Sequence, residues 1–277
     1  MTIVIRSDQE FTTLLQSSLR ARYEKRNRSE DEGAHVSDIL PSSCLRKQYY
    51  GRKFPALETI TDESIHHFIR GEASEFVITE LANIGVAQAD LEFDGLIAHP
   101  DILDKDVIIE LKDTQSTVRL DITDQRFRSY LRQLLYYLTI TGIEKGIISI
   151  RYSNREMRWI KSDEKGDYFF RPFAGKGPRI ESWSVLLPKD DIARELFKNE
   201  MIRRKNLFVK AINENDVSIL PRINKKLRSS KCMNCVYYDK CMNEDEETPR
   251  AAKMANEIDL LDIEGVVDFK PLFNKRQ

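Results

Sequence analysis

The order of elements in this sequence predicts an α/β protein with a mixed central sheet flanked by helices. Three observations lead to this fold class. Residues 61–83 and 125–141 repeat apolar side chains at helical spacing, residues 95–114 alternate apolar and polar side chains around a tight turn, and residues 146–152 form an apolar strand. Helix, hairpin, helix and strand in this order imply an α/β domain with a mixed sheet.

The size and composition of the chain limit its class. At 277 residues, it can form one elaborated domain or two small ones. No apolar run approaches the ~18 residues of a membrane span, and the first residues lack the regions of a signal peptide, so we expect a soluble cytoplasmic protein without a membrane partner. In that reducing compartment, the four cysteines are not expected to form disulfides. With a net charge of −1, nucleic-acid binding would depend on local basic patches.

The residues before the hairpin are predicted to be mostly helical. Ser7 and Glu10 form a capping box, and an apolar face follows. That face consists of Phe11, Leu14, Leu15 and Leu19. Residues 20–33 are a mixed-charge loop or solvated face, and an element that begins near residue 36 carries Cys44. The helix over 61–83 is expected to bury Ile65, Phe68, Ile69, Phe76, Val77 and Leu81.

A hairpin over residues 95–114, with its turn at 104–106, carries the most informative polar residues. Side chains alternate along a strand, so Glu110 and Lys112 share one face, and we expect the opposite, apolar face to make the core. Hairpin pairing brings Asp101 to the same end. Two carboxylates and a lysine there could bind a hard divalent cation and leave an ammonium group beside its bound water. The alternative is a solvated hairpin with ordinary surface charges.

The rest of the chain continues the α/β pattern. Residues 125–141 give the clearest amphipathic helix, whose apolar stripe is Phe127, Tyr130, Leu131, Leu134, Leu135 and Leu138. The elements that follow are a strand at 146–152, a turn at 153–154, a strand at 157–160, a loop rich in glycine and proline at 166–178, a strand at 182–187 and a long helix from Asp190 or Asp191 to about residue 213.

The cysteines form a second pattern. Cys232, Cys235 and Cys241 give the spacing Cys-x2-Cys-x5-Cys, and Cys44 lies far upstream. Zinc ribbons usually pair two short Cys-x2-Cys knuckles, so three clustered thiols and one remote thiol match zinc poorly. Four thiolates suit an iron–sulfur cluster, although a lone buried cysteine is the alternative for Cys44.

Together these motifs resemble one nuclease family. Pro100-Asp101 followed by Glu110-Leu111-Lys112 matches PD-(D/E)xK, Gln133 and Tyr137 match a Gln-x3-Tyr helix, and the cysteines follow in the family's order. The chain resembles RecB-like iron–sulfur exonucleases, and is most similar to the CRISPR-associated RecB-like exonuclease family. The resemblance implies a restriction-endonuclease-like core with iron–sulfur-stapled N- and C-terminal segments. It divides the chain into an N-terminal helix and charged loop (1–35), a nuclease domain with a 4Fe–4S cluster (36–241) and a charged tail (242–277).

The resemblance also implies roles for the polar residues of the hairpin. Asp101 and Glu110, with the Leu111 backbone carbonyl and Glu75, would hold one or two Mg²⁺ or Mn²⁺ ions, and Lys112 would position or deprotonate the attacking water. The family has a histidine where this chain has Glu75. A carboxylate can still bind these metals, but the change could also lower activity or alter the metal preference.

Gln133 and Tyr137 lie one helical turn apart and so share a face. The resemblance places them near the scissile phosphate or the DNA strand, where they would orient the substrate. Without it, Gln133 would be a solvated residue and Tyr137 an edge of the core stripe.

The implied activity is metal-dependent exonuclease cleavage of single-stranded DNA or DNA ends, in CRISPR spacer acquisition or in DNA repair. No Gly-x4-Gly-Lys-Ser/Thr loop occurs, so a helicase or CRISPR integrase proteins would supply DNA ends, or the chain would bind them directly. Arg46, Lys47, Tyr49 and Tyr50 could carry a single strand, or equally belong to a helix that supports the cluster. The rival interpretations are a catalytically weakened iron–sulfur DNA-binding or scaffold protein, and a nuclease stapled by zinc.

Overall fold

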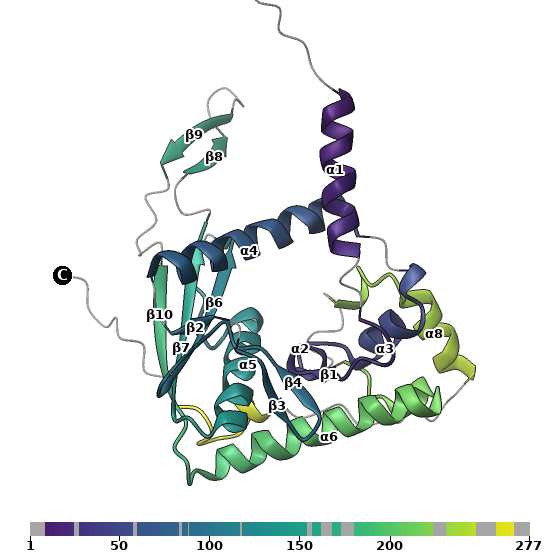
Figure 1. Ribbon diagram of the computed structural model, residues 1–277, viewed down its shortest axis with the longest axis vertical. Helices are drawn as coiled ribbons and strands as arrows, with labels where there is room; N and C mark the ends of the chain where they lie inside the picture. Colours follow the sequence, from purple (N-terminus) through teal and green to yellow (C-terminus); the bar gives the residue numbers. More distant parts are fainter. Residues whose placement is uncertain are drawn as a thin grey trace, which may run out of the picture.

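Five strands form the central sheet of the computed structural model, in the order β10 (Ile180–Leu186), β7 (Lys145–Tyr152), β6 (Val107–Thr114), β5 (Ile102–Asp104) and β2 (Val86–Ala87) (Figure 1). Strands β6 and β7 are parallel, and the other neighbours are antiparallel. The predicted mixed sheet is therefore confirmed. The structure describes residues 9–24, 28–57, 60–82, 85–87, 89–116, 118–153, 157–161, 168–172, 180–223, 231–247 and 259–268.

Two smaller sheets accompany the central one. The first has the order β1 (Ala34–His35), β4 (Leu96–Ala98) and β3 (Leu91–Phe93), and the second pairs β8 (Met157–Lys161) with β9 (Tyr168–Pro172). Strand β9 lies where the sequence predicted a loop over 166–178, so that prediction is wrong for these residues. The aromatic run that begins at Tyr168 favours a strand, and the flanking glycines and prolines concealed it.

The helices of the described residues lie around these sheets. In chain order they are α1 (Gln9–Glu24), α2 (Val36–Ile39), α3 (Leu45–Lys53), α4 (Asp62–Ala82), α5 (Gln125–Thr141), α6 (Ile192–Glu214) and α8 (Tyr238–Glu247), with 3-10 turns at Pro55–Leu57, Val217–Ile219 and Leu260–Asp262. The predicted bounds of α5 are confirmed. Asp124 caps it by accepting from Arg126 N, and Gly142 ends it with a left-handed φ of 72°. Asp191, one of the two predicted caps, begins α6.

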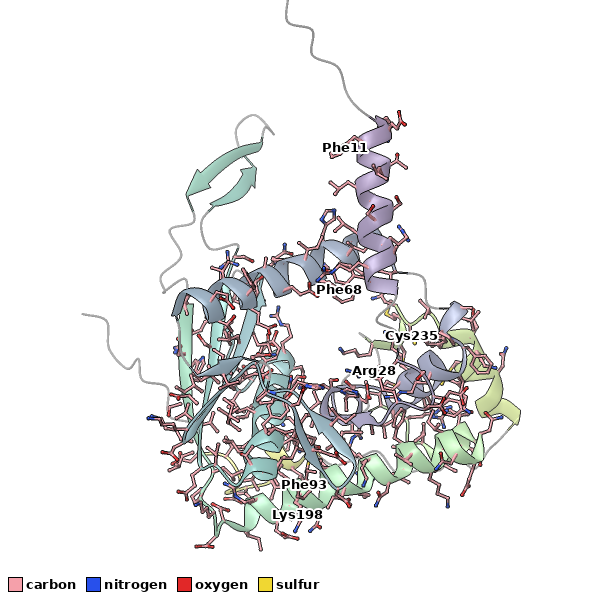
Figure 2. The ribbon with its side chains drawn as sticks, viewed as in Figure 1. Phe11, Arg28, Phe68, Phe93, Lys198 and Cys235 are labelled. Carbon is pink, nitrogen blue, oxygen red and sulfur yellow. The ribbon has the colours of Figure 1, made fainter. Side chains whose placement is uncertain are left out.

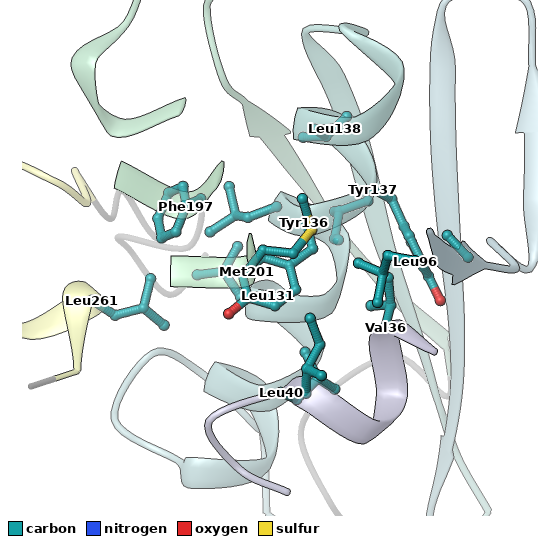
Figure 3. Packing of buried hydrophobic residues seen from close by; sticks show 14 of the residues in the cluster. Val36, Leu40, Leu96, Leu131, Tyr136, Tyr137, Leu138, Phe197, Met201 and Leu261 are labelled. Atoms are coloured by element: carbon teal, nitrogen blue, oxygen red, sulfur yellow. The ribbon is translucent and has the colours of Figure 1, made fainter. Parts of the chain in front are cut away.

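The larger of two hydrophobic clusters among the described residues connects distant parts of the chain. The apolar face of α5 packs against β6 and β7 on one side and against α6 on another. Figure 3 shows Leu131 of α5, Phe197 of α6, Val36 of α2 and Leu96 of β4 gathered in this cluster, and Leu261 reaches it from near the C-terminus. The core therefore extends across nearly the whole chain. No helix among the described residues is long and apolar enough to cross a membrane.

The first strand of the predicted hairpin is broken. Strands β4 and β5 belong to different sheets, and the residues between them, 99–101, carry Pro100. Proline has no backbone N–H to donate to a ladder, which suits it to the end of a strand. The antiparallel pairing of β5 with β6 then follows the prediction, with Ile102 opposite Ile109. Asp101 is thereby placed at the start of β5.

The buried face of β6 is the opposite of the predicted one. Ile108 and Glu110 are both 0% exposed, whereas the alternate face, which includes Ile109, is only half-buried. Ile108 and Glu110 lie on the same face of β6, and α5 packs against β6, so this face is buried. Glu110 is thus a carboxylate on the core side of the sheet.

Helices α1 and α4 bury less apolar surface than the sequence predicted. Ile65 is buried as expected, but Phe68, Phe76 and Val77 of α4 are exposed, and the side chain of Leu81 lies outside the described residues. Helix α1 contacts α4 near its C-terminal end, where Tyr23 lies against Phe68. Figure 2 shows Phe11 at the far end of α1, away from the core. Periodicity identifies an apolar face but does not say what covers it.

Part of the predicted charged tail belongs to the core. Leu261 is 7% exposed, and Asp259 accepts from Arg128 Nη2 at 2.6 Å and from Arg132 Nη2 at 2.5 Å. Arg132 is almost completely buried and also pairs with Glu200 of α6. Residues 259–268, which the sequence assigns to the charged tail, are therefore held on α5 by buried charge pairs.

Replacing Arg132 with methionine is expected to lower the free energy of unfolding by about 3 kcal/mol, because Glu200 would stay buried without its cation. Arg126→Met is the matched control: this arginine of the same helix pairs with Asp124, is 50% exposed, and should contribute less than about 1 kcal/mol. Urea unfolding of both variants measures the difference. Equal losses in the two variants would contradict the buried role of Arg132.

Candidate functional site

Three of the residues predicted to form a site meet where β5 begins beside β6. The Oδ2 atom of Asp101 accepts a hydrogen bond from Leu111 N at 2.6 Å, which fixes its carboxylate against β6. Lys112 Nζ forms an ion pair with Glu110 Oε1 and lies 3.6 Å from Asp101 Oδ2. The pairing register of the hairpin therefore brings both carboxylates and the lysine together, as the sequence predicted.

Burial and neighbouring charges shift the pKa values of Glu110 and Lys112. Burial raises the pKa of Glu110 to about 8, and the charge of Asp101 adds to the rise while Lys112 opposes it. Burial pulls the pKa of Lys112 down, but the charges of Glu110 and Asp101 outweigh it and hold that pKa above its usual value. The ammonium group of Lys112 therefore stays protonated, and the carboxyl group of Glu110 gains or loses its proton near neutral pH.

One oxygen of Glu110 is left for a ligand. Its Oε2 atom is buried and has no hydrogen-bond partner among the residues that the structure describes. A buried carboxylate oxygen without a donor is costly unless a cation or ligand satisfies it. In the described ranges, no three His, Cys, Asp or Glu side chains lie close enough to hold one metal ion. Mg²⁺ needs only one or two protein carboxylates, so Asp101 and Glu110 fit such an ion as a pair.

Helix α5 places Gln133 and Tyr137 next to these charges. Gln133 Nε2 donates to Tyr137 Oη at 2.9 Å, and Tyr137 Oη donates to the backbone carbonyl of His99 at 3.1 Å. Burial raises the pKa of Tyr137, and the nearby charge of Glu110 adds to the rise, so the phenol stays neutral. The predicted pair thus borders the carboxylates and ties α5 to the residues just before Asp101.

Glu75 of α4 is half-buried, and its charge is close enough to add to the raised pKa of Glu110. A contact that the sequence did not reveal holds α4 against the sheet, since Arg70 Nε lies 2.5 Å from Asp113 Oδ1 of β6. Within the sheet, Arg151 Nη1 of β7 donates to Asp113 Oδ2 at 2.8 Å. The side chain of Asp113 is only 2% exposed. In the sequence, only the position of Asp113 directly after Lys112 could have indicated that it lies near the site. Its partners, Arg70 and Arg151, lie on other elements and could not be identified from the sequence.

The four cysteines line one cavity of about 780 Å³. Cys44 occupies the N-cap position of α3, Cys232 and Cys235 precede α8, and Cys241 lies within α8. Figure 1 shows α3 and α8 side by side. Burial raises the pKa of the Cys44 thiol, and the nearby Cys241 and Cys232 add to the rise. All four are free thiols. The structure therefore gathers the remote cysteine and the clustered three around one space.

Contacts around this cavity join α3 to the C-terminal segment. The rings of Tyr50 and Tyr237 stack with centroids 5.6 Å apart, and Arg46 Nη1 donates to Cys241 Sγ at 3.7 Å. These contacts hold α3 and the C-terminal segment together beside the half-buried cysteines.

The predicted DNA contacts on α3 need correction. Arg46, Tyr49 and Tyr50 are 1–4% exposed, so they present no face on which a base could stack, and only Lys47 of the four is exposed. The same interleaving of basic and aromatic residues instead packs around the cysteine cavity. Of the two interpretations that the sequence left open, the helix that supports the cysteines agrees with this burial.

No family model and no curated protein matches this chain. Among solved structures, SSO0001 is 15% identical with a TM-score of 0.49, covering 83% of this chain and 95% of that one. An alkaline exonuclease from Laribacter hongkongensis is 13% identical with a TM-score of 0.40, covering 72% and 95%. A phage-related exonuclease from Haemophilus somnus is 12% identical with a TM-score of 0.40, covering 62% and 82%. These likenesses are too distant to carry an argument about activity.

Proposed function

We propose that this chain is a metal-dependent DNA exonuclease that hydrolyses phosphodiester bonds at Asp101, Glu110 and Lys112. The observation that carries the proposal is the convergence of both carboxylates on Lys112, which pairs with Glu110 Oε1 and lies 3.6 Å from Asp101 Oδ2. The other oxygen of Glu110, Oε2, is buried and has no hydrogen-bond partner among the described residues. A fixed ammonium group beside two carboxylates matches what phosphodiester hydrolysis needs, namely a cation site and a donor for the attacking water or the phosphate. Single-stranded DNA or DNA ends are the substrate that we propose.

In the proposed mechanism, each side chain has a task. Asp101 and Glu110 would hold Mg²⁺ or Mn²⁺, with the Leu111 carbonyl and Glu75 as further oxygen donors, and such an ion lowers the pKa of a bound water and neutralises charge on the transition state. Lys112 stays protonated beside its two carboxylates, so we propose that it positions the water and the phosphate and does not act as the base.

The two residues of α5 have a supporting task in this mechanism. Tyr137 donates to the His99 carbonyl and Gln133 donates to Tyr137, which holds α5 beside the residues that precede Asp101. We propose that this chain of hydrogen bonds orients the substrate strand over the carboxylates. DNA ends would reach the site directly or through a partner such as a helicase or CRISPR integrase proteins.

The cysteine cavity supports a structural 4Fe–4S cluster as part of the proposal. Each cysteine of such a cluster binds a different iron atom, so its sulfurs stand further apart than four sulfurs on one zinc ion. All four thiols line one cavity. Three clustered thiols and one remote thiol match the paired Cys-x2-Cys knuckles of a zinc ribbon poorly, so we propose a cluster and not a zinc ion.

A substrate comparison tests the proposed activity. The full chain, purified without air, is incubated with Mn²⁺ and with linear or circular single-stranded DNA of the same sequence. We expect the linear strand to be shortened and the circle to survive, because an exonuclease needs an end. Survival of both substrates across a Mg²⁺ and Mn²⁺ titration would favour the iron–sulfur scaffold without activity. Cleavage of the circle would make the enzyme an endonuclease.

Glu75 is expected to act as a metal ligand or as a base next to the metal. Glu75→His should keep or raise the activity on linear DNA, whereas Glu75→Ala should lower it about tenfold. Glu80→Ala, an exposed glutamate on the same helix, is the matched control and should have no effect. Rates are compared across a Mn²⁺ titration. If Glu75→Ala equals wild type at every concentration, Glu75 lies outside the site.

The affinity for Mn²⁺ is expected to depend on pH. A cation binds the ionised form of Glu110, and burial raises the pKa of that carboxyl to about 8, so protons compete with the metal below this pH. Affinity should therefore rise roughly tenfold per pH unit up to about pH 8 and level off above it. Free Mn²⁺ is measured by its EPR signal. A flat affinity between about pH 6 and about pH 8 would show that Glu110 is not a ligand.

A further inference from the structure

The side chain of Arg46 lies inside the cysteine cavity. It is 1% exposed and lines the cavity together with the four cysteines. Its Nη1 atom donates to Cys241 Sγ at 3.7 Å, and its Nε atom donates to the Leu220 carbonyl at 3.1 Å. These two hydrogen bonds fix the plane of the guanidinium group against one of the four thiols.

The charges around the cavity suit an anion. Among the described residues, its charged lining consists of the buried cation Arg46, the half-buried Arg222, the solvent-exposed Lys47 and one carboxylate, Asp239. Burying a guanidinium group is costly unless hydrogen bonds and opposite charge offset the lost hydration. A hydrogen bond from a cation to a sulfur is favourable when the sulfur is a thiolate, as it is when it binds a metal.

We propose that Arg46 is a positioning residue for the cluster, which holds Cys241 as a thiolate ligand and raises the reduction potential of the iron. This inference rests on the proposed 4Fe–4S cluster. A cluster with four thiolates is an anion, and one electron from an external donor makes it more negative without changing any bond. A buried guanidinium that donates to one of its sulfurs stabilises the reduced form more than the oxidised form.

Three variants of the full chain test this role. Arg46→Met removes the charge and both hydrogen bonds with little change of volume, and Arg46→Lys keeps the charge. Lys47→Met removes a neighbouring charge that is exposed and therefore screened by solvent. Each protein is purified without air, its iron content per chain is measured, and its midpoint potential is determined by a dithionite titration with redox mediators.

We expect Arg46→Met either to hold iron at a lower midpoint potential than wild type or to lose iron that Arg46→Lys retains. Lys47→Met should stay close to wild type in both measurements. Unchanged iron and potential in Arg46→Met, a shift in Lys47→Met as large as in Arg46→Met, or equal loss of iron in both Arg46 variants would overturn the role of this charge. Wild-type protein without iron would instead refute the proposed cluster itself.

Discussion

Glu110→Gln is expected to reduce Mn²⁺-dependent degradation of linear single-stranded DNA by about a thousandfold or more. The amide keeps the shape of a side chain that is completely buried, but it removes the negative charge that would bind the cation. Lys112→Met should have a comparable effect, because it removes the ammonium group that pairs with Glu110 and lies 3.6 Å from Asp101. Initial rates of nucleotide release from end-labelled DNA measure both losses.

Two controls separate chemistry from folding in that experiment. Glu92→Gln changes an exposed glutamate on β3 and should leave the rate unchanged. Thermal unfolding of each variant shows whether the protein is folded at the assay temperature, which matters for Lys112→Met because it leaves Glu110 buried without its cation. A folded Glu110→Gln protein with the wild-type rate would exclude Glu110 from the reaction.

Cys44→Ala is expected to lose iron and colour as completely as Cys232→Ala does. The four cysteines line one cavity, and the chain contains no other thiol that could replace Cys44. A covalent tie between segments so far apart in sequence constrains the unfolded chain by about 5 kcal/mol in the loop-closure model, so the melting temperature should fall as well. Nuclease activity should also fall as α3 loosens, although Asp101, Glu110 and Lys112 are intact.

Ser43→Ala is the matched control for that loss, since it changes the residue next to Cys44 and removes no thiol. It should retain its iron. Iron per chain is measured with a colorimetric chelator, and absorbance near ~400 nm reports the cluster. If Cys44→Ala holds as much iron as wild type, Cys44 is not a ligand, and the link between the two ends of the chain is lost.

Local patterns in the sequence predicted the elements that position the candidate site. The helix α5 was predicted from its apolar stripe, and the structure adds the cap residues Asp124 and Gly142 at its two ends. The approach of Asp101 to Glu110 follows from the register of a short hairpin. These features depend on contacts between near neighbours, which the order of residues reveals directly.

Features that depend on contacts between distant segments could not be predicted from the sequence. The charge and aromatic character of Arg46 and Tyr50 suit a DNA path and a helix that supports the cysteines equally well, and only the packing of α8 and its neighbours shows that they are buried. Similarly, Asp259 belongs to an acidic stretch that suggested a solvated tail, and only the buried Arg132 shows where it docks. In each case the same residue type can lie on the surface or in the interior, and its burial depends on whether a distant segment packs over it.

The central claim is that Asp101 and Glu110 hold the divalent cation used for DNA hydrolysis. Crystals of the full chain soaked in Mn²⁺, with diffraction recorded at the manganese absorption edge, locate that cation directly. We predict an anomalous peak between the two carboxylates in wild-type protein and no such peak in Glu110→Gln. A wild-type protein that degrades DNA with Mn²⁺ but shows its anomalous peak elsewhere would contradict the claim.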